Sequence, residues 1–288
     1  AKATALVTDS KDVLYLSTNS GSVYTVANDG SLTLFAKVGR KPLAMIFDKN
    51  GNLYTANNTD NTVSKVTPAG VVSLFATVKT QPTGLAFDSN NNLYVTNFMD
   101  DNVSKITPSG VTTVFATVGS GPQSLVIDSS GSLFVLNSSD STISKITSAG
   151  VVSTFAKVGN GAKAITIDAS GNLYTANYLD NTVSKVTPAG QVSTFALTGS
   201  GPTAILLSNN SLYTANNLDN SITQIGLAEQ RISAPTNLST TKLYSTSVDL
   251  SWDSLGANAV GYFAEATTDN GVTLAASSRT SGNANSFN

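Results

Sequence analysis

The chain has 288 residues, of which 40% are hydrophobic and 12% are charged, and its formal net charge is −2. This length can bury a substantial core in one or two domains. The low charge, with no basic cluster, argues against nucleic acid and against an anionic membrane surface as partners. No apolar run approaches the ~18 residues of a spanning helix, so we expect no membrane insertion. The sequence has neither Cys nor His, which excludes disulfides, zinc-thiolate sites, cysteine nucleophiles and the commonest general base.

A short segment recurs along most of the chain, with the form Asn-Leu-Tyr-Thr-Ala-Asn at residues 52–57. Its leucines are spaced 39, 40, 40, 40 and 39 residues apart, at Leu14, Leu53, Leu93, Leu133, Leu173 and Leu212. Self-similarity at a fixed period is the mark of a repeat architecture, in which each copy forms one supersecondary unit. The sequence therefore predicts six tandem copies of a unit about 40 residues long.

Each copy predicts four short strands, which fall at 85–88, 93–96, 102–107 and 111–116 in the third copy. The segment Pro108-Ser109-Gly110 separates the last two as a tight turn, because Pro presets φ and Gly accepts a positive φ. Four antiparallel strands every ~40 residues are typical of a β-propeller. We predict an all-β, six-bladed β-propeller of four-stranded antiparallel blades over residues 1–233. The sixth copy is the weakest, since Arg231-Ile232-Ser233 stands where the other copies have a strand ending in Phe.

The repeat resembles two known propeller families. The run Leu93-Tyr94-Val95-Thr96-Asn97, followed by Asn102-Val103-Ser104, resembles the YVTN repeat. The pattern Pro82-x-Gly84-Leu85-x-Phe87-Asp88, followed by Asn92-Leu93-Tyr94, resembles the NHL repeat. Together these resemblances cover roughly residues 2–233 and imply a propeller fold.

The period stops at Ala234, and residues 234–288 resemble the first part of a fibronectin type III domain. The resemblance rests on Pro235, Leu238, the alternating Val248, Leu250 and Trp252, and Tyr262. The alternation alone predicts a half-buried strand. We expect an incomplete β-sandwich, since the closing strands of that family are missing. Its open edge, with Val248, Leu250, Trp252 and Tyr262, is a hypothetical assembly edge for self-association by strand addition.

Two acidic positions recur in most copies of the repeat. The segment from Asp48 to Asn52 superficially resembles a calcium loop, but it carries a single acid, so we interpret it as a hairpin turn. The acids after the second strand (Asp60, Asp100, Asp140, Asp180 and Asp219) are interpreted as turn-locking groups rather than as a cation ring. We therefore expect no metal and no cofactor. A Lys of the third strand, such as Lys105, is expected to pair with an Asp that closes a first strand.

The loops after the second strand vary more than the rest of the repeat. Their tips carry large apolar side chains, which are poorly explained by folding and suggest an interaction surface for a protein or glycan. The alternative is that they fold inward over neighbouring loops. The candidate apolar residues are Phe98, Met99, Tyr178, Leu179 and Leu218. Polar contacts on the same face are expected from Arg40, Lys41, Gln123 and Lys163, and no catalytic residue is assigned.

From these features we expect a non-enzymatic microbial protein, secreted to the extracellular space or the cell surface. Its expected role is adhesion, ligand binding or assembly into a surface layer or filament, which is an inference by analogy of fold. The alternative is a metal-dependent propeller enzyme, lactonase-like or lyase-like, with a calcium-type site in the channel. The propeller contains no His and a single Glu, Glu229, which favours the first interpretation.

Overall fold

The computed structural model describes residues 2–227 and, beyond them, the segments 239–243, 248–251, 262–267, 273–280 and 286–287. The described residues form strands, turns and bends. Among them, no helix is present that has the length and hydropathy needed to cross a membrane. The chain divides into two units, Ala1–Ile225 and Gly226–Asn288. The predicted domain boundary at residues 233 and 234 lies outside the described residues.

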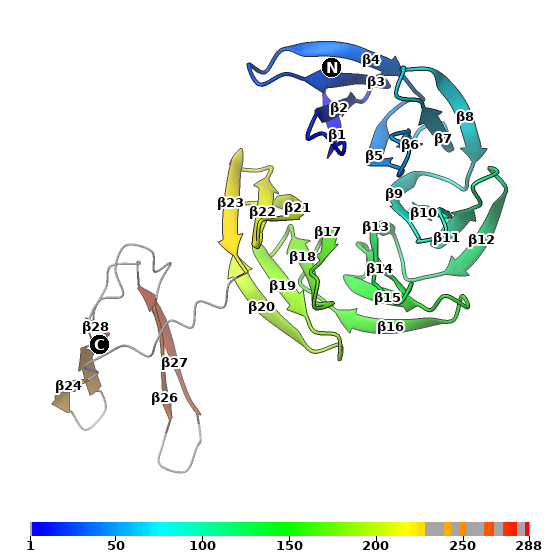
Figure 1. Ribbon diagram of the computed structural model, residues 1–288. Helices are drawn as coiled ribbons and strands as arrows, with labels where there is room; N and C mark the ends of the chain where they lie inside the picture. Colours follow the sequence, from blue (N-terminus) through cyan, green and yellow to red (C-terminus); the bar gives the residue numbers. More distant parts are fainter. Residues whose placement is uncertain are drawn as a thin grey trace. The chain divides into compact units, whose positions relative to one another are not determined.

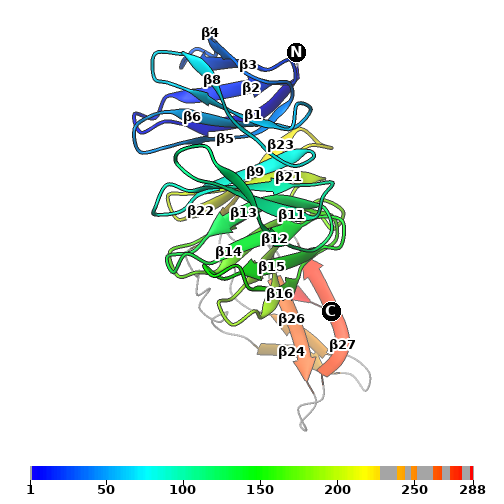
Figure 2. The ribbon, with the colours of Figure 1, turned by 90° about the vertical axis from the view of Figure 1, so that its right-hand side faces the viewer.

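The first unit is a ring of six antiparallel sheets, so the predicted all-β, six-bladed propeller is confirmed (Figure 1). Five sheets have four strands in sequence order, and the sixth has three described strands. Figure 2 views the same ring from its side, with blade 1 in blue and the later blades in green. The residues predicted as the fourth strand of blade 6, Arg231 to Ser233, lie outside the described part of the chain.

The strands of blades 1 to 3 are β1 (Ala3–Thr8), β2 (Leu14–Thr18), β3 (Ser22–Val26), β4 (Leu32–Lys37), β5 (Pro42–Phe47), β6 (Leu53–Asn57), β7 (Thr62–Val66), β8 (Val72–Thr77), β9 (Pro82–Phe87), β10 (Leu93–Asn97), β11 (Asn102–Ile106) and β12 (Thr112–Thr117). Those of blades 4 to 6 are β13 (Pro122–Ile127), β14 (Leu133–Asn137), β15 (Thr142–Ile146), β16 (Val152–Lys157), β17 (Ala162–Ile167), β18 (Leu173–Asn177), β19 (Thr182–Val186), β20 (Val192–Leu197), β21 (Pro202–Ser208), β22 (Ser211–Asn216) and β23 (Ser221–Gly226). The first strand of each blade lies innermost, next to the central channel (Figure 1).

The core lies between blades, because each sheet is apolar on both sides. We call the side that faces the next blade in sequence the forward face, and the opposite side the backward face. Between blades 2 and 3, Tyr54 and Val63 of the forward face pack against Leu93, Val95 and Ile106 of the backward face. Equivalent clusters lie between blades 1 and 2, 3 and 4, and 4 and 5. The strand alternation of the repeat therefore supplies one half of a core on each side of every blade.

The recurring Asp that closes the first strand of blades 1 to 5 forms a turn, as interpreted from the sequence. Asp48 Oδ1 accepts hydrogen bonds from the backbone N–H groups of Asn50 (2.9 Å) and Asn52 (2.8 Å), and Gly51 takes a positive φ of 76°. Burial raises the pKa of Asp48, but hydrogen bonds from the side chain and backbone of Asn52 outweigh it, so the pKa lies below its usual value. The Tyr54 hydroxyl donates to the same carboxylate at 3.3 Å. Burial and this negative charge raise the pKa of Tyr54.

The expected pairing of the third-strand lysines with these aspartates is wrong. Among the described residues the single ion pair joins Arg40 and Asp60. The ammonium group of Lys105 instead lies 5.5 Å from the ring centre of Tyr94 and 5.7 Å from that of Phe115. The same arrangement recurs at Lys65, Lys145 and Lys185. The aspartate is already occupied by turn donors, so the lysine takes the negative face of the aromatic rings as its partner.

The second unit contains two small sheets in its described residues. One has the order β24 (Ser239–Leu243), β25 (Val248–Ser251), β28 (Ser286–Phe287), and the other pairs β26 (Tyr262–Thr267) with β27 (Thr273–Thr280). The resemblance to a fibronectin type III domain is not confirmed by these strands. Strand β25, which carries Val248 and Leu250, is paired on both sides. Trp252 lies outside the described residues, and the assembly edge stays a prediction.

Candidate functional site

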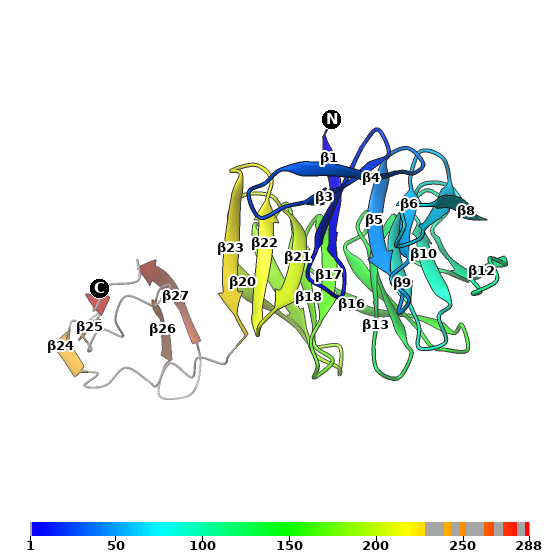
Figure 3. The same cartoon turned by 45° about the horizontal axis from the view of Figure 1, so that its top comes forward.

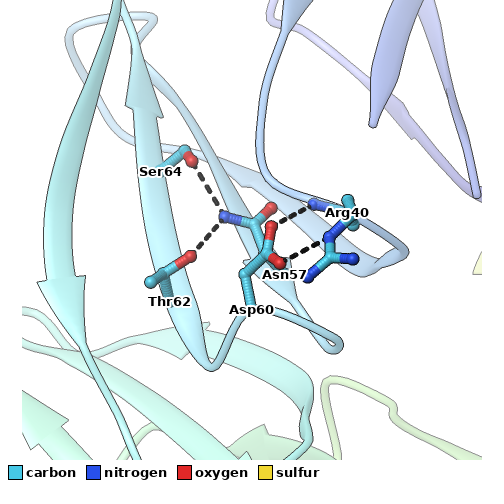
Figure 4. A network of polar contacts seen from close by, with 5 residues as sticks. All are labelled: Arg40, Asn57, Asp60, Thr62 and Ser64. Carbon is cyan, nitrogen blue, oxygen red and sulfur yellow. Dashed lines mark hydrogen bonds and ion pairs between the residues drawn. The ribbon is translucent and has the colours of Figure 1, made fainter. Parts of the chain in front are cut away.

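One face of the propeller gathers two kinds of segment from blades 2 to 6, and we call it the loop face. It consists of the loops between second and third strands (58–61, 98–101, 138–141, 178–181 and 217–220) and the links between blades (38–41, 78–81, 118–121, 158–161 and 198–201). Hydrogen bonds join each loop to the link that precedes its blade. In blade 2, for example, the backbone N–H of Arg40 donates to Asp60 at 2.6 Å (Figure 4).

The recurring loop acid holds this link in place in every such blade. Its carboxylate accepts a hydrogen bond from a link N–H at Ser120 (2.9 Å), Asn160 (2.7 Å) and Ser200 (2.6 Å), and also at Thr80. The backbone N–H of Arg40 lowers the pKa of Asp60 against a small opposing effect of burial. The five acids thus make side chain to backbone hydrogen bonds as expected, but the bond that all five share fixes the preceding link, and backbone bonds within the acid's own turn are seen at Asp140 and Asp219. The Arg40 guanidinium adds an ion pair of 2.8 Å to Asp60, with its side chain 70% exposed.

Beneath the loops lies a buried asparagine that ends the second strand of blades 2 to 6. Asn57 is fully buried, and its Nδ2 donates to Thr62 Oγ1 at 3.0 Å and to Ser64 Oγ at 2.8 Å (Figure 4). Its Oδ1 accepts from Thr55 Oγ1 at 2.8 Å. In blades 3 and 4 this Thr is replaced by Val95 and Val135. The Oδ1 atoms of Asn97 and Asn137 are accordingly buried without a hydrogen-bond partner.

These oxygens do not make a calcium site. Calcium takes six to eight oxygen ligands and favours carboxylates. The described residues contain no group of three or more His, Cys, Asp or Glu that could hold a metal ion. The loop acids, such as Asp100 and Asp140, are engaged by link N–H groups, and the unpaired buried amide oxygens are spread over two blades, with Asn97 Oδ1 in blade 3 and Gln123 Oε1 and Asn137 Oδ1 in blade 4. The donor set of the described residues does not fit the calcium-type channel site of the alternative interpretation.

The predicted loop-tip surface separates into two kinds of side chain. Phe98 and Tyr178 are half-buried and lie over the link of the next blade. Their Cε2 atoms would meet a Cβ at Gly121 and Gly201 at 3.1 and 2.9 Å, so these links need glycine. Met99, Leu179 and Leu218 are instead 60%, 68% and 62% exposed. The side chains at the first tip position, Phe98 and Tyr178, thus fold inward as in the alternative interpretation. Those at the second position, Met99, Leu179 and Leu218, form an exposed apolar rim. Leu218 lies beside Tyr178 over Gly201.

The innermost strands carry a further set of equivalent residues at their loop-face ends. Each follows the first residue of its strand and lies at a β-bulge, where it has no cross-strand partner. A bulge re-aims a side chain and is often found beside a functional site. We call this set the channel-mouth ring, and in blade order it is Thr4, Leu43, Thr83, Gln123, Lys163 and Thr203.

Two polar candidates from the sequence, Gln123 and Lys163, belong to this ring, and both are half-buried. Gln123 Oε1 is buried without a hydrogen-bond partner. Thr83 Oγ1 donates to the carbonyl of Pro122 at 2.9 Å, which ties β9 to β13. Lys41, an exposed link residue with a φ of 53°, is not part of the ring. Sequence reasoning did not identify the ring as a set. The available signal was a variable residue that directly follows the Pro or Ala at the start of each first strand.

Fold and site together define a β-propeller with a mixed polar and apolar loop face at the mouth of its channel. No family model matches the chain, and no curated protein matches its sequence. Among solved structures, a streptogramin B lyase is similar with a TM-score of 0.67 and 18% identity, over 78% of this chain and 83% of that one. An inactive His-to-Ala virginiamycin B lyase from Staphylococcus aureus, bound to quinupristin, gives 0.66 and 16%, over 87% and 92%. A protein described as a candidate gluconolactonase gives 0.63 and 15%, over 78% and 88%.

These comparisons correct the main functional expectation from the sequence. The similar propellers are a lyase and a candidate lactonase, so the expectation of a non-enzymatic protein for adhesion, structure or self-assembly is wrong. They match the alternative of a lyase-like or lactonase-like propeller. Identities this low establish a shared fold, and the named activities belong to those proteins. The sequence reasoning relied on the missing His and Glu, but fold similarity at this level does not depend on those residues.

Proposed function

We propose that this chain is a propeller enzyme of the lyase or lactonase kind, which opens a cyclic ester at the mouth of its channel. The observation that carries the proposal is a cation, Lys163, one blade from an unpaired buried amide oxygen, Gln123 Oε1, in the channel-mouth ring. This ring lies in a fold whose similar solved structures include a lyase and a candidate lactonase.

The ring's side chains suit an ester substrate. Opening a lactone by elimination or by hydrolysis places negative charge on a carbonyl or carboxylate oxygen, and a fixed cation in a partly buried site stabilises such charge. Lys163 supplies that cation. Gln123 Oε1 can accept a hydrogen bond from an N–H or O–H of the substrate once its side chain turns out of its buried position, and this bond satisfies the unpaired oxygen. Thr83 and Thr203 add hydroxyl groups on either side.

The chemistry cannot copy the virginiamycin B lyase that is inactive after a His-to-Ala replacement, because this chain has no His. We derive no step through a metal ion, since the described donor groups do not fit calcium. The proposal therefore rests on charge stabilisation and positioning by the chain's own side chains.

The test incubates the purified chain with quinupristin, gluconolactone and a matched linear ester, and follows each by mass spectrometry. Ring opening without a change of mass indicates elimination, whereas the gain of one water indicates hydrolysis. Lys163→Met is expected to lower kcat/KM by a factor of about 10² to 10³. Lys157→Met, at the exposed end of β16, is the matched control and should behave as the parent chain. Absence of ring opening across the panel, or full activity of Lys163→Met, would refute the proposal.

A further inference from the structure

Five junctions between blades bury their apolar faces, but the forward face of blade 6 remains exposed. Ile222 of β23 is 74% exposed, whereas its equivalents Val63, Val103, Ile143 and Val183 are all 0% exposed. On the same face, Leu206 is 61% exposed, and Ala204 and Ala215 are exposed as well. Figure 3 shows the three strands of this blade, β21 to β23, side by side. This apolar face is equivalent to one half of the core between two blades, and none of the described residues covers it.

The backward face of blade 1 is the matching half. Leu6 is 60% exposed, whereas its equivalents Met45, Leu125 and Ile165 are 8%, 6% and 6% exposed. Leu14 and Leu16 of β2 are only half-buried. The innermost strands contact one another in chain order from β1 to β21, but β21 and β1 make no contact of comparable extent. The ring in Figure 1 is correspondingly open between the yellow and blue blades.

We propose that the opening between blades 6 and 1 is the seat of one further blade of this same repeat. A junction in this ring always joins a forward face to a backward face, as between Tyr54 and Leu93 in the second junction. The opening presents one free face of each kind. A unit that covers both must therefore have a backward face of Leu, Ile and Val and a forward face with Tyr or Phe, which describes a single blade of the repeat.

The continuity of the interface and its lack of charge support this partner. The free faces present Leu6, Leu14, Ala215 and Ile222, and none of these could pair with a charged ligand or a phosphate. Exposed apolar surface in a contiguous patch marks a site of protein contact. In the four described apolar clusters, the equivalent residues of other blades pack against the face of a neighbouring blade, so a blade is the partner that this surface fits.

The absence of Cys makes a direct test possible. Single Ile222→Cys and Leu6→Cys variants of the 288-residue chain are reacted with a thiol reagent. Met99→Cys, on the exposed rim, is the exposed control, and Val63→Cys is the buried control. We expect the two junction thiols to react within about threefold of the exposed control, and the buried control to react about 100-fold more slowly.

A seven-repeat variant then carries a copy of residues 160–199 directly before Ala1. In this variant we expect both junction thiols to be protected by about 100-fold, in a monomer whose Tm rises by roughly 5 °C. Its control carries Asp at the positions of Leu173 and Val183 in the added copy only, which should restore reactivity. Protection of both thiols in the original monomer would mean that the chain closes its own ring. Protection that depends on protein concentration would mean a second copy. Either result, or reactive thiols in the seven-repeat variant, overturns the proposal.

Discussion

A single methyl-for-hydroxyl difference separates blades that are otherwise closely alike. The buried Asn that ends the second strand of blades 2 to 6 has a fully paired side chain where Thr55, Thr175 or Thr214 stands two residues before it. Where Val95 or Val135 stands there, the amide oxygen loses its donor. An unpaired buried acceptor costs more than an average hydrogen bond contributes, because its lost hydration is not replaced. Blades 3 and 4 therefore carry a local cost that a one-residue change removes.

We predict that Val135→Thr stabilises the propeller by about 1 kcal/mol, because it gives Asn137 Oδ1 a donor without changing side-chain size. The reverse change, Thr55→Val, should cost about 1–3 kcal/mol by leaving Asn57 Oδ1 unpaired. Denaturant unfolding measures both. Val63→Thr, which places a hydroxyl in an apolar cluster, is the matched control and should be destabilising. A destabilising Val135→Thr would show that the unpaired oxygen has another partner, such as water.

Within blades 2 to 5, the second, third and fourth strands form one recurring element. The Tyr or Phe of the second strand and the Phe of the fourth meet edge to face, with ring centres 5.1 Å apart for Tyr94 and Phe115. The third-strand Lys lies near both rings. The Lys, Tyr, Phe and Asp occur together in the same copies of the repeat, so the sequence alone does not show which of them are in contact. In the structure, the Asp carboxylate accepts the hydrogen bonds of its turn, and the Lys ammonium group lies over the aromatic rings.

A double-mutant cycle tests this assignment. We predict that Lys105→Met costs about 0.5–1 kcal/mol, which is typical of a partly exposed cation–π contact. The coupling energy of Lys105→Met with Phe115→Leu should account for most of that cost. The cycle of Lys105→Met with Asp88→Asn, measured by the same denaturant unfolding, should show a smaller coupling. A larger coupling to Asp88 would restore the ion pair expected from the sequence.

The sequence predicts the elements well because the constraints on them are local. Turn residues such as Gly51 and the alternation of each strand repeat every 40 residues or so, and they give the number of blades and the order of strands. The register that places Lys163 at a bulge, or leaves Gln123 Oε1 unpaired, depends on neighbouring strands and cannot be read from one repeat. Leu6 and Ile222 match their buried equivalents in residue type, so no sequence signal distinguishes the open junction from the filled ones.

For the whole molecule, function depends on how equivalent positions diverge around one ring. The loop face keeps its Asp–link hydrogen bonds in blades 2 to 6, which gives a rigid frame. The side chains that this frame carries outward differ from blade to blade, namely those of the channel-mouth ring and of the apolar rim of Met99, Leu179 and Leu218. A rigid scaffold with variable surface positions is the usual way in which one fold supports different ligands.

The rim is the part of this face that folding does not require. We predict that the triple change of Met99, Leu179 and Leu218 to Ser leaves Tm nearly unchanged, because these side chains are 60%, 68% and 62% exposed. The matched double change of Phe98 and Tyr178 to Ser should lower the stability by about 1 kcal/mol or more for each residue, because their rings cover Gly121 and Gly201.

If the rim contacts the cyclic ester proposed above, the triple variant should raise KM several-fold while kcat stays close to that of the parent chain, since rim contacts bind substrate and transition state alike. Thermal unfolding and steady-state kinetics on the same preparations separate these effects. A triple variant that melts as early as the double variant would assign the rim to the core of the loop face. An unchanged KM would place the substrate inside the channel mouth, away from the rim.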